Sequence, residues 1–167
     1  KPGQPNVITL RGERGTGKTW MALHLKRTEL PKNPAVRPLL ISLISSFDPD
    51  YKPQGSKSLN DELFVTLDKP DAPTPEAFCV ETLRWVAKNL GTTLTEQAGA
   101  DELSNWLVRD INQNLSYKVI VLILDSVFET DWSYLKKLEE YLLVPLATLP
   151  NTLLIMTGRG ISYPWTS

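Results

Sequence analysis

The sequence has little cysteine, little histidine and almost no net charge. Its single cysteine, Cys79, cannot form a disulfide within the chain, so we predict a reducing, cytoplasmic location. Its single histidine, His24, has no second metal-type ligand nearby, so we expect it on the surface or in packing and not at a metal. Eighteen basic against nineteen acidic residues give a formal net charge of −1, without the basic excess typical of nucleic-acid binders. No run of eighteen apolar residues occurs, so we expect no membrane partner.

What the sequence does have is the composition of one folded domain. Its 167 residues are 41% hydrophobic and 22% charged, within the range of globular proteins. A chain of this length can bury roughly 70% of its unfolded surface, so we expect one domain over residues 1–167. Because the chain starts at Lys1 and ends after "ISYPWTS", we also expect this domain to be a piece of a longer multidomain protein.

Apolar runs alternate with helical patterns along the chain. Strands are predicted over 7–11, 37–43, 117–125 and 152–159, the third being central because residues 119–124 are six consecutive apolar residues. Helices are predicted over 17–30, 74–91, 101–115 and 133–143, and loops over 45–60 and 69–75. We expect the first helix to end before Pro31 and the last to be broken or kinked at Pro145. This alternation predicts an α/β fold with a doubly wound, mainly parallel sheet and helices on both faces.

The second and third predicted helices have well-defined apolar faces. Thr74 can cap the helix that runs over 74–91, Pro75 suits its first position, and Gly91 ends it. Cys79 lies on the apolar face of this helix, so we expect a core residue and not a reactive thiol. In the next helix the apolar residues follow one another at four-residue spacing: Leu103, Leu107, Ile111 and Leu115.

The stretch "GERGTGKT" matches the phosphate-binding pattern G-x-x-x-x-G-K-[ST] between a predicted strand and a predicted helix. Glycines allow the backbone to turn successive N–H groups toward phosphate oxygens, and the alternative is a glycine-rich structural turn. We expect Lys18 to bridge the β- and γ-phosphates and Thr19 to place its hydroxyl on Mg²⁺. The predicted nucleotide-binding residues are Gly12, Glu13, Arg14, Gly15, Thr16, Gly17, Lys18 and Thr19. For Arg14 the alternatives are a phosphate or partner contact and a solvated charge.

Hydrolysis also requires a carboxylate near the metal and a group that positions water. Asp125 ends the central strand, where ligands of open α/β sheets bind, so we predict that it holds Mg²⁺ together with Thr19. Glu129 is the candidate for activating water. The alternatives are a turn-capping role for Asp125 and a surface position for Glu129.

Two further segments bear on the predicted site. Thr157 and Arg159 end the last predicted strand, where Arg159 can sense the γ-phosphate unless it is an ordinary surface arginine. Trp20 directly follows Thr19, and for it we favour packing of the helix over stacking on adenine. The predicted catalytic residues are Lys18, Asp125, Glu129 and Arg159.

Together these segments resemble the STAND class of P-loop ATPases, the signal-transducing NTPases that include the NACHT and NB-ARC groups within the AAA+-related division. "GERGTGKT" matches the Walker A sequence of this family, "LILDSVFE" is similar to its NACHT-type Walker B, and "LLIMTGR" resembles its sensor strand. In that Walker B, an apolar strand ends in Asp, a small residue, an apolar residue and two acids. Asp125, Ser126, Val127 and Glu129 fit this order, but Phe128 replaces the first of the two acids.

The resemblance implies the three-layer sandwich of P-loop NTPases, with ATP or ADP and Mg²⁺ as cofactors. It also implies a switch that controls oligomerisation or effector release, with self-association or other domains of the full protein as partners. Because only Glu129 remains to position water, slow hydrolysis is expected. Adenine as the base follows from the resemblance and from the missing guanine motifs, not from a base-binding motif.

Several alternatives remain open. Residues 125–128 read "DSVF" and not Asp-x-x-Gly, and no Asn-Lys-x-Asp occurs, which disfavours a GTPase. A small-molecule kinase shares the phosphate loop but usually has an arginine-rich lid, and no clear arginine cluster is present beyond the loop. A DNA-directed AAA+ ATPase would need a basic surface outside this chain. An interaction module that binds nucleotide without turnover is the non-enzymatic alternative.

Overall fold

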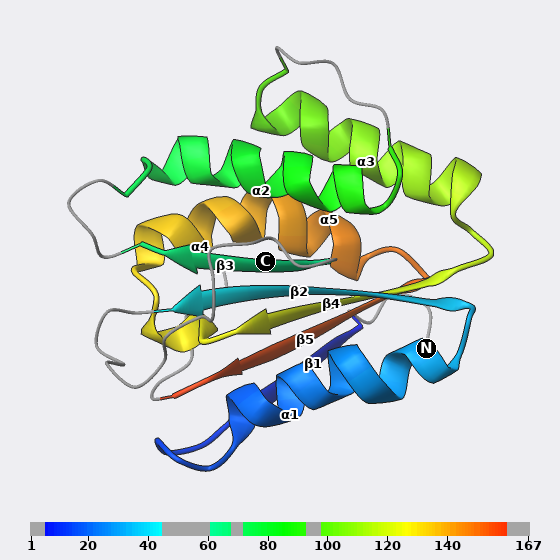
Figure 1. The fold of residues 1–167 in the computed structure, drawn as a ribbon. Coiled ribbons are helices and arrows are strands. Elements are labelled where there is room, and N and C mark those ends of the chain that lie inside the picture. Colours follow the sequence, from blue (N-terminus) through cyan, green and yellow to red (C-terminus); the bar gives the residue numbers. More distant parts are fainter. Residues whose placement is uncertain (1–5, 45–60, 68–71, 93–97, 160–167) are drawn as a thin grey trace.

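The fold was analysed in a computed structural model, which describes residues 6–44, 61–67, 72–92 and 98–159 (Figure 1). The predicted loop over 45–60 lies outside the described residues, as do residues 69–71 of the loop predicted over 69–75, whereas 72–74 are irregular and a helix begins at Pro75.

Five parallel strands form one sheet in the order β1-β5-β4-β2-β3. They are β1 Val7–Arg11, β2 Val36–Ile44, β3 Glu62–Thr66, β4 Val119–Asp125 and β5 Thr152–Gly158. This confirms the α/β fold with a parallel sheet and the central place of β4. The fifth strand, β3, was not predicted, because its five residues begin with the charged Glu62 directly after a polar stretch.

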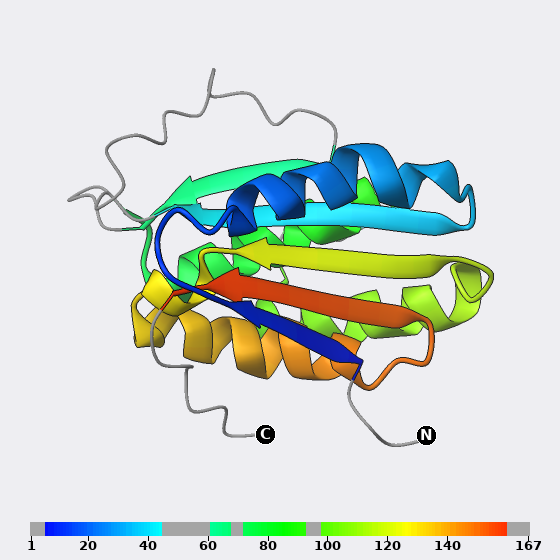
Figure 2. The same cartoon turned by 90° about the horizontal axis from the view of Figure 1, so that it is seen from below.

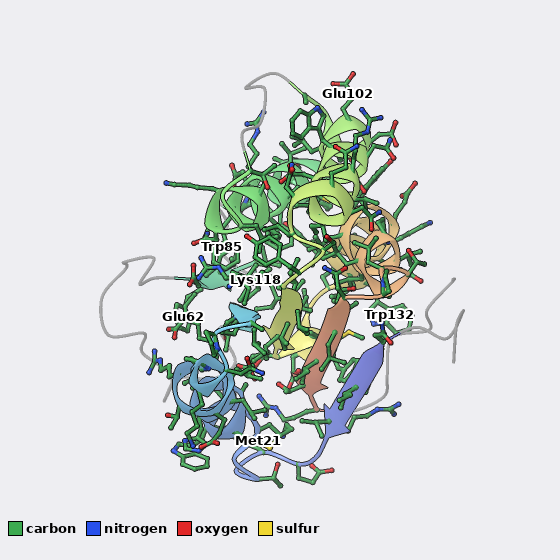
Figure 3. All side chains as sticks on the ribbon, turned by 90° about the vertical axis from the view of Figure 1, so that its right-hand side faces the viewer. Met21, Glu62, Trp85, Glu102, Lys118 and Trp132 are labelled. Carbon is green, nitrogen blue, oxygen red and sulfur yellow. The ribbon has the colours of Figure 1, made fainter. Side chains whose placement is uncertain are left out.

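Helices cover both faces of the sheet, as predicted (Figure 3). One face carries α1 Lys18–His24, which continues as the π segment η1 Leu25–Glu29 and the 3₁₀ turn η2 Leu30–Lys32. On the other face lie α2 Pro75–Asn89, the short 3₁₀ turn η3 Val127–Glu129, and α4 Trp132–Leu138, which continues as the π segment η4 Glu139–Leu143 and α5 Val144–Ala147. The remaining helix, α3 Ala100–Asn114, packs against α2 and forms an outer layer (Figure 1).

The predicted signals of α2 are confirmed. The Thr74 hydroxyl accepts a hydrogen bond from the Ala77 backbone N–H at 3.2 Å, and Pro75 opens the helix. Gly91 follows with a φ of 79°, a left-handed conformation that suits glycine at a helix end. Cys79 is fully buried, and this burial raises the pKa of its thiol to about 12. The thiol is therefore a core group, as expected.

Pro31 does not end its helix, which corrects that prediction, whereas at Pro145 the helix changes from the π segment η4 to α5, an interruption of the predicted kind. Each proline follows a π segment, η1 or η4, and lies in the first turn of the short helix that comes next. The first N–H groups of a helix have no acceptor within that helix. A proline in the first turn, which lacks an N–H, therefore loses no hydrogen bond. The change to π geometry alters the hydrogen-bond pattern just before the proline, so the chain keeps its helical course.

The core has two parts of unequal size. The larger lies between the sheet and α2, α3, α4 and α5, and the smaller lies beneath α1 and contains Ala22, Leu40, Val121, Ile123 and Ile155. Seen from the α1 side, no described helix covers β1 (Figure 2), and Ile8 on that strand is 45% exposed. The inner strands of the sheet are therefore more deeply buried than the edge strand β1. The candidate site lies at the carboxyl ends of these strands.

Candidate functional site

The sheet order brings the three predicted motifs to one edge. β5 lies between β1 and β4, and Arg11 of β1 pairs with Gly158 of β5. Leu124 of β4 pairs with Met156 on the other side of β5. Because all three strands are parallel, the segments that follow their carboxyl ends are neighbours in space.

The glycine loop between β1 and α1 depends on two left-handed residues. Gly15 and Gly17 have φ angles of 81° and 79°, which L side chains adopt only with strain. Gly12 is required for another reason, because a Cβ on it would lie 2.9 Å from the Thr16 Oγ1. These three positions explain why the predicted phosphate-binding stretch needs its glycines.

Lys18 is held by the loop itself. Its Nζ donates to the carbonyl oxygens of Gly12 at 2.7 Å and Glu13 at 2.8 Å, and to the Thr16 Oγ1 at 3.1 Å. The ammonium group therefore lies across the loop, while the exposed Glu13 contributes its backbone carbonyl. An anion that binds between the loop N–H groups would compete with these carbonyls for Lys18.

Asp125 is the most heavily hydrogen-bonded carboxylate of the site. It is only 2% exposed and accepts hydrogen bonds from four hydroxyls, which come from Thr19, Ser42, Ser126 and Thr157. The Thr19 Oγ1 lies 3.1 Å and 3.0 Å from the two carboxylate oxygens, and the Thr157 Oγ1 lies 2.6 Å from one of them. No ammonium or guanidinium group of the described residues forms an ion pair with Asp125, so hydroxyls alone compensate its burial.

One of these hydroxyls, that of Ser42, was missed in the sequence. Ser42 lies at the carboxyl end of β2, pairs with Asp125 across the sheet, and donates to its Oδ2 at 3.1 Å. A polar residue that interrupts the apolar run "LLISLI" was the available signal. It could not be interpreted without knowing that β2 lies beside β4.

Glu129 and Arg159 contact each other, although separate roles were predicted for them. The backbone N–H and the Nε of Arg159 both donate to the Glu129 Oε1 at 2.9 Å. The other carboxylate oxygen, Oε2, is buried without a hydrogen-bond partner among the described residues. Thus Glu129 lies at the site with one oxygen held by Arg159 and the other buried and unpartnered among the described residues.

The backbone around Glu129 is closely packed against β5. A Cβ on Gly158 would lie 2.6 Å from the Phe128 ring and 2.9 Å from the Glu129 Oε2, so only glycine fits there. Phe128, at the position of the first acid in the NACHT-type Walker B sequence, is buried. The Arg11 guanidinium lies 5.6 Å from the centroid of its ring. Phe128 therefore serves packing, and Glu129 is the one acid of the predicted pair that this segment supplies.

A pocket of about 210 Å³ joins these segments. It is lined by Arg14, Gly15, Gly17, Lys18, Thr19, Trp20, Asp125, Ser126, Glu129, Thr157, Gly158 and Arg159. The structure thus brings together all four predicted catalytic residues. Gly12, Glu13 and Thr16 are not in the pocket wall and act through the shape of the loop.

Trp20 does not pack in the core, which corrects the preferred prediction. Its side chain is 68% exposed at the pocket and stacks on the His24 ring, with ring centroids 5.0 Å apart and an interplanar angle of 5°. The Nε2 of His24 lies 3.3 Å from the Glu29 Oε1. His24 is thus a half-exposed packing partner of Trp20, in agreement with its predicted position.

Metal and membrane features are limited in the described part of the chain. Within it, no group of three or more His, Cys, Asp or Glu side chains is arranged to hold a metal ion. Thr19 and Asp125 form a smaller pair of oxygen donors, which suits Mg²⁺ that keeps water or phosphate ligands. Among the described helices, none combines the length and apolar character of a membrane span.

Comparison with known proteins gives no relative. No protein-family model matches the chain, and no curated protein matches it. The function must therefore be argued from the geometry of the site and from the motifs.

Proposed function

We propose that this chain is the nucleotide-binding core of a STAND-type P-loop ATPase, a Mg²⁺-dependent switch that hydrolyses ATP slowly. The observation that carries the proposal is the contact between the Thr19 hydroxyl and the Asp125 carboxylate at 3.0 Å and 3.1 Å. It joins the end of the glycine loop to the end of β4, the two places from which such a site draws its metal-binding oxygens.

The glycine loop would bind the triphosphate. Its left-handed residues, Gly15 and Gly17, turn backbone N–H groups into the loop, and Lys18 supplies a positive charge. When phosphate binds, the Lys18 Nζ would exchange the carbonyls of Gly12 and Glu13 for phosphate oxygens. Hydrogen bonds between an ammonium group and an anionic phosphate oxygen are stronger than those from the same ammonium group to neutral carbonyls, so this exchange favours binding.

Thr19 and Asp125 would hold Mg²⁺, which neutralises phosphate charge during transfer. The Ser42 and Thr157 hydroxyls fix the Asp125 carboxylate from neighbouring strands, so it needs little reorganisation to act as a ligand. Two protein oxygens are the usual number for Mg²⁺ shared with a nucleotide.

Glu129 would orient the attacking water. Its Oε2 makes no hydrogen bond within the described residues but is buried, so it would accept a proton from water once the side chain turns toward the pocket. Arg159 holds the other oxygen at 2.9 Å, so the carboxylate direction depends on Arg159. A γ-phosphate near Arg159 would compete for its guanidinium, which links the nucleotide state to Glu129.

The same ion pair favours a second candidate function. If Arg159 keeps Glu129 engaged when ATP is bound, the chain is a nucleotide-binding interaction module without turnover. In both cases we place the protein in the cytoplasm, with self-association or other domains of a longer protein as partners. No specific observation at the site favours the small-molecule kinase or the DNA-directed AAA+ ATPase.

The test is titration calorimetry of the chain with Mg²⁺ and ATP, ADP or GTP. We expect ATP and ADP to bind, and Lys18→Ala to weaken ATP binding at least tenfold. The matched control is Lys118→Ala, since Lys118 precedes β4 at the amino end of the strand, does not line the pocket, and donates from its Nζ to the Pro34 carbonyl. Equal binding of ATP by wild type and Lys18→Ala would contradict the proposal. If ATP binding depends on Lys18, single-turnover hydrolysis separates the switch from the module without turnover.

A further inference from the structure

Trp20 is the most exposed aromatic side chain at the pocket, at 68%, and it directly follows the predicted metal ligand Thr19. An indole left in water forgoes the burial that usually stabilises tryptophan. Yet Trp20 has a fixed orientation, because its ring stacks almost parallel to that of His24. An exposed and ordered aromatic face beside a phosphate loop is the feature that the proposed function does not yet use.

The direction of Trp20 follows from the helix. Ala22 is buried beneath α1 against the sheet, and Thr19 points toward Asp125. Trp20 and His24 are four residues apart and therefore share another face of α1, turned to solvent. The contact between the His24 Nε2 and the Glu29 Oε1 ties the imidazole ring beneath the indole to η1. The indole is thus supported from one side and open on its other face.

We propose that Trp20 is the base-binding platform of this site and stacks on the purine ring of a nucleotide whose phosphates lie in the glycine loop. This inference rests on the proposed function and adds the specificity of the site. A stacking platform reads the size of the aromatic ring and not the hydrogen-bonding edge of the base. Purine nucleotides, both ATP and GTP, therefore bind more tightly than CTP and UTP.

The size of the effect follows from stacking energies. Replacing an aromatic platform by alanine weakens binding about 5- to 100-fold per base. The loss belongs to the base alone, because Trp20 makes no contact to the loop carbonyls that hold Lys18. Inorganic tripolyphosphate, which has the phosphates without the base, is the probe that isolates it.

The experiment compares Mg-ATP with Mg-tripolyphosphate by calorimetry on wild type, Trp20→Ala, Trp20→Phe and Trp106→Ala. Trp106 is 44% exposed on α3, outside the pocket, and is the matched control. We expect Trp20→Ala to weaken ATP about 5- to 100-fold and to leave tripolyphosphate within about twofold. Trp20→Phe should recover most of the affinity, Trp106→Ala should change neither ligand, and ATP should quench fluorescence in wild type but not in Trp20→Ala.

Two results would overturn the inference alone. In one, Trp20→Ala binds ATP as wild type does; in the other, it loses ATP and tripolyphosphate equally, so that Trp20 supports the loop and not the base. Wild type that binds neither ligand would overturn the proposed function together with the platform. Because Trp20 is exposed, its variants should fold, and far-ultraviolet circular dichroism verifies this.

Discussion

At the scale of single residues, the site is built from carboxylates whose two oxygens have different surroundings. Both Asp125 oxygens accept hydroxyl donors, whereas Glu129 has one oxygen held by Arg159 and one without a partner among the described residues. A carboxylate held at both oxygens suits a metal ligand, and one with an unpartnered oxygen suits a base once that oxygen reaches water in the pocket. The two acids are therefore not interchangeable.

Glu129→Gln tests this division. We expect ATP binding to remain within about threefold, because the loop and Asp125 are untouched. Turnover should fall about 10²- to 10⁴-fold, the usual contribution of a general base. Single-turnover hydrolysis of radiolabelled ATP measures it, with Glu102→Gln on α3 as control, because Glu102 does not line the pocket. Unchanged turnover would remove Glu129 from the mechanism and favour the interaction module.

Gly158→Ala tests the packing beneath Glu129. The added Cβ would lie 2.6 Å from the Phe128 ring, so η3 must shift. Overpacking of this kind costs about 1–3 kcal/mol of unfolding free energy, measured by chemical denaturation. Gly99→Ala is the control, because a Cβ there meets nothing within 4 Å. If the Gly158→Ala protein were as stable as the Gly99→Ala control, η3 could move without a cost in stability, and the predicted close packing against β5 would be contradicted.

At the scale of elements, local signals predicted most boundaries and missed those that depend on neighbours. The cap at Thr74 and the stop at Gly91 are written in adjacent residues, so α2 was predictable. The strand β3 was not, since Glu62 looks like a surface acid until Arg27 is seen beside it. The contact between Ser42 and Asp125 likewise exists only because β2 and β4 are neighbours.

Glu62 connects the edge strand β3 to η1. Its carboxylate accepts two hydrogen bonds from the Arg27 guanidinium, each 2.7 Å, and lies 3.4 Å from the Lys26 Nζ. Burial, the largest influence, raises the pKa of Glu62, but the hydrogen bonds and charges of Arg27 and Lys26 together outweigh it. The pKa is consequently lowered from its ordinary value of 4.5.

This shift predicts a pH dependence of stability. Because the folded state holds the pKa below the unfolded value, the stabilisation is fully present above the unfolded pKa and is lost as the pH falls through the folded pKa. Glu62→Gln should cost about 1–3 kcal/mol at pH 7. The difference between wild type and variant, measured by urea unfolding, should shrink below about pH 4.5. A difference that is constant from pH 7 to pH 3 would contradict the assigned ion pair.

At the scale of the whole molecule, the sequence predicted the architecture and the members of the site but not their contacts. The α/β class, the parallel sheet and the central place of β4 could be predicted, because long apolar runs are buried whichever element packs against them. The pairing of Glu129 with Arg159 depends on β5 lying directly beside β4, which no local pattern reports. The outward direction of Trp20 also depends on which face of α1 meets the sheet.

Nucleotide should stabilise the whole fold, because the site draws on both ends of the chain. At a ligand concentration of 100 times the Kd, binding adds about 2.7 kcal/mol to the unfolding free energy. For a chain of this length that raises Tm by about 5–10 °C. Thermal unfolding with and without Mg-ATP measures the shift, which Lys18→Ala should abolish and Lys118→Ala should retain. A shift that persists in Lys18→Ala would indicate binding elsewhere.

The pairing of β1 with β5 also sets the order in which the molecule can be made. Val7 pairs with Leu154, and in the described sheet β1 has no other strand partner. A ribosome adds about 5–20 residues per second, so the strand that leads into the glycine loop waits about 7–30 s for its partner. During that interval β2 and β4 can already associate, while the loop has no strand to anchor it. The nascent chain can thus begin its sheet before β5 exists, but both parts of the core include residues of β5, so the core and the anchor of the glycine loop are completed together once β5 has been made.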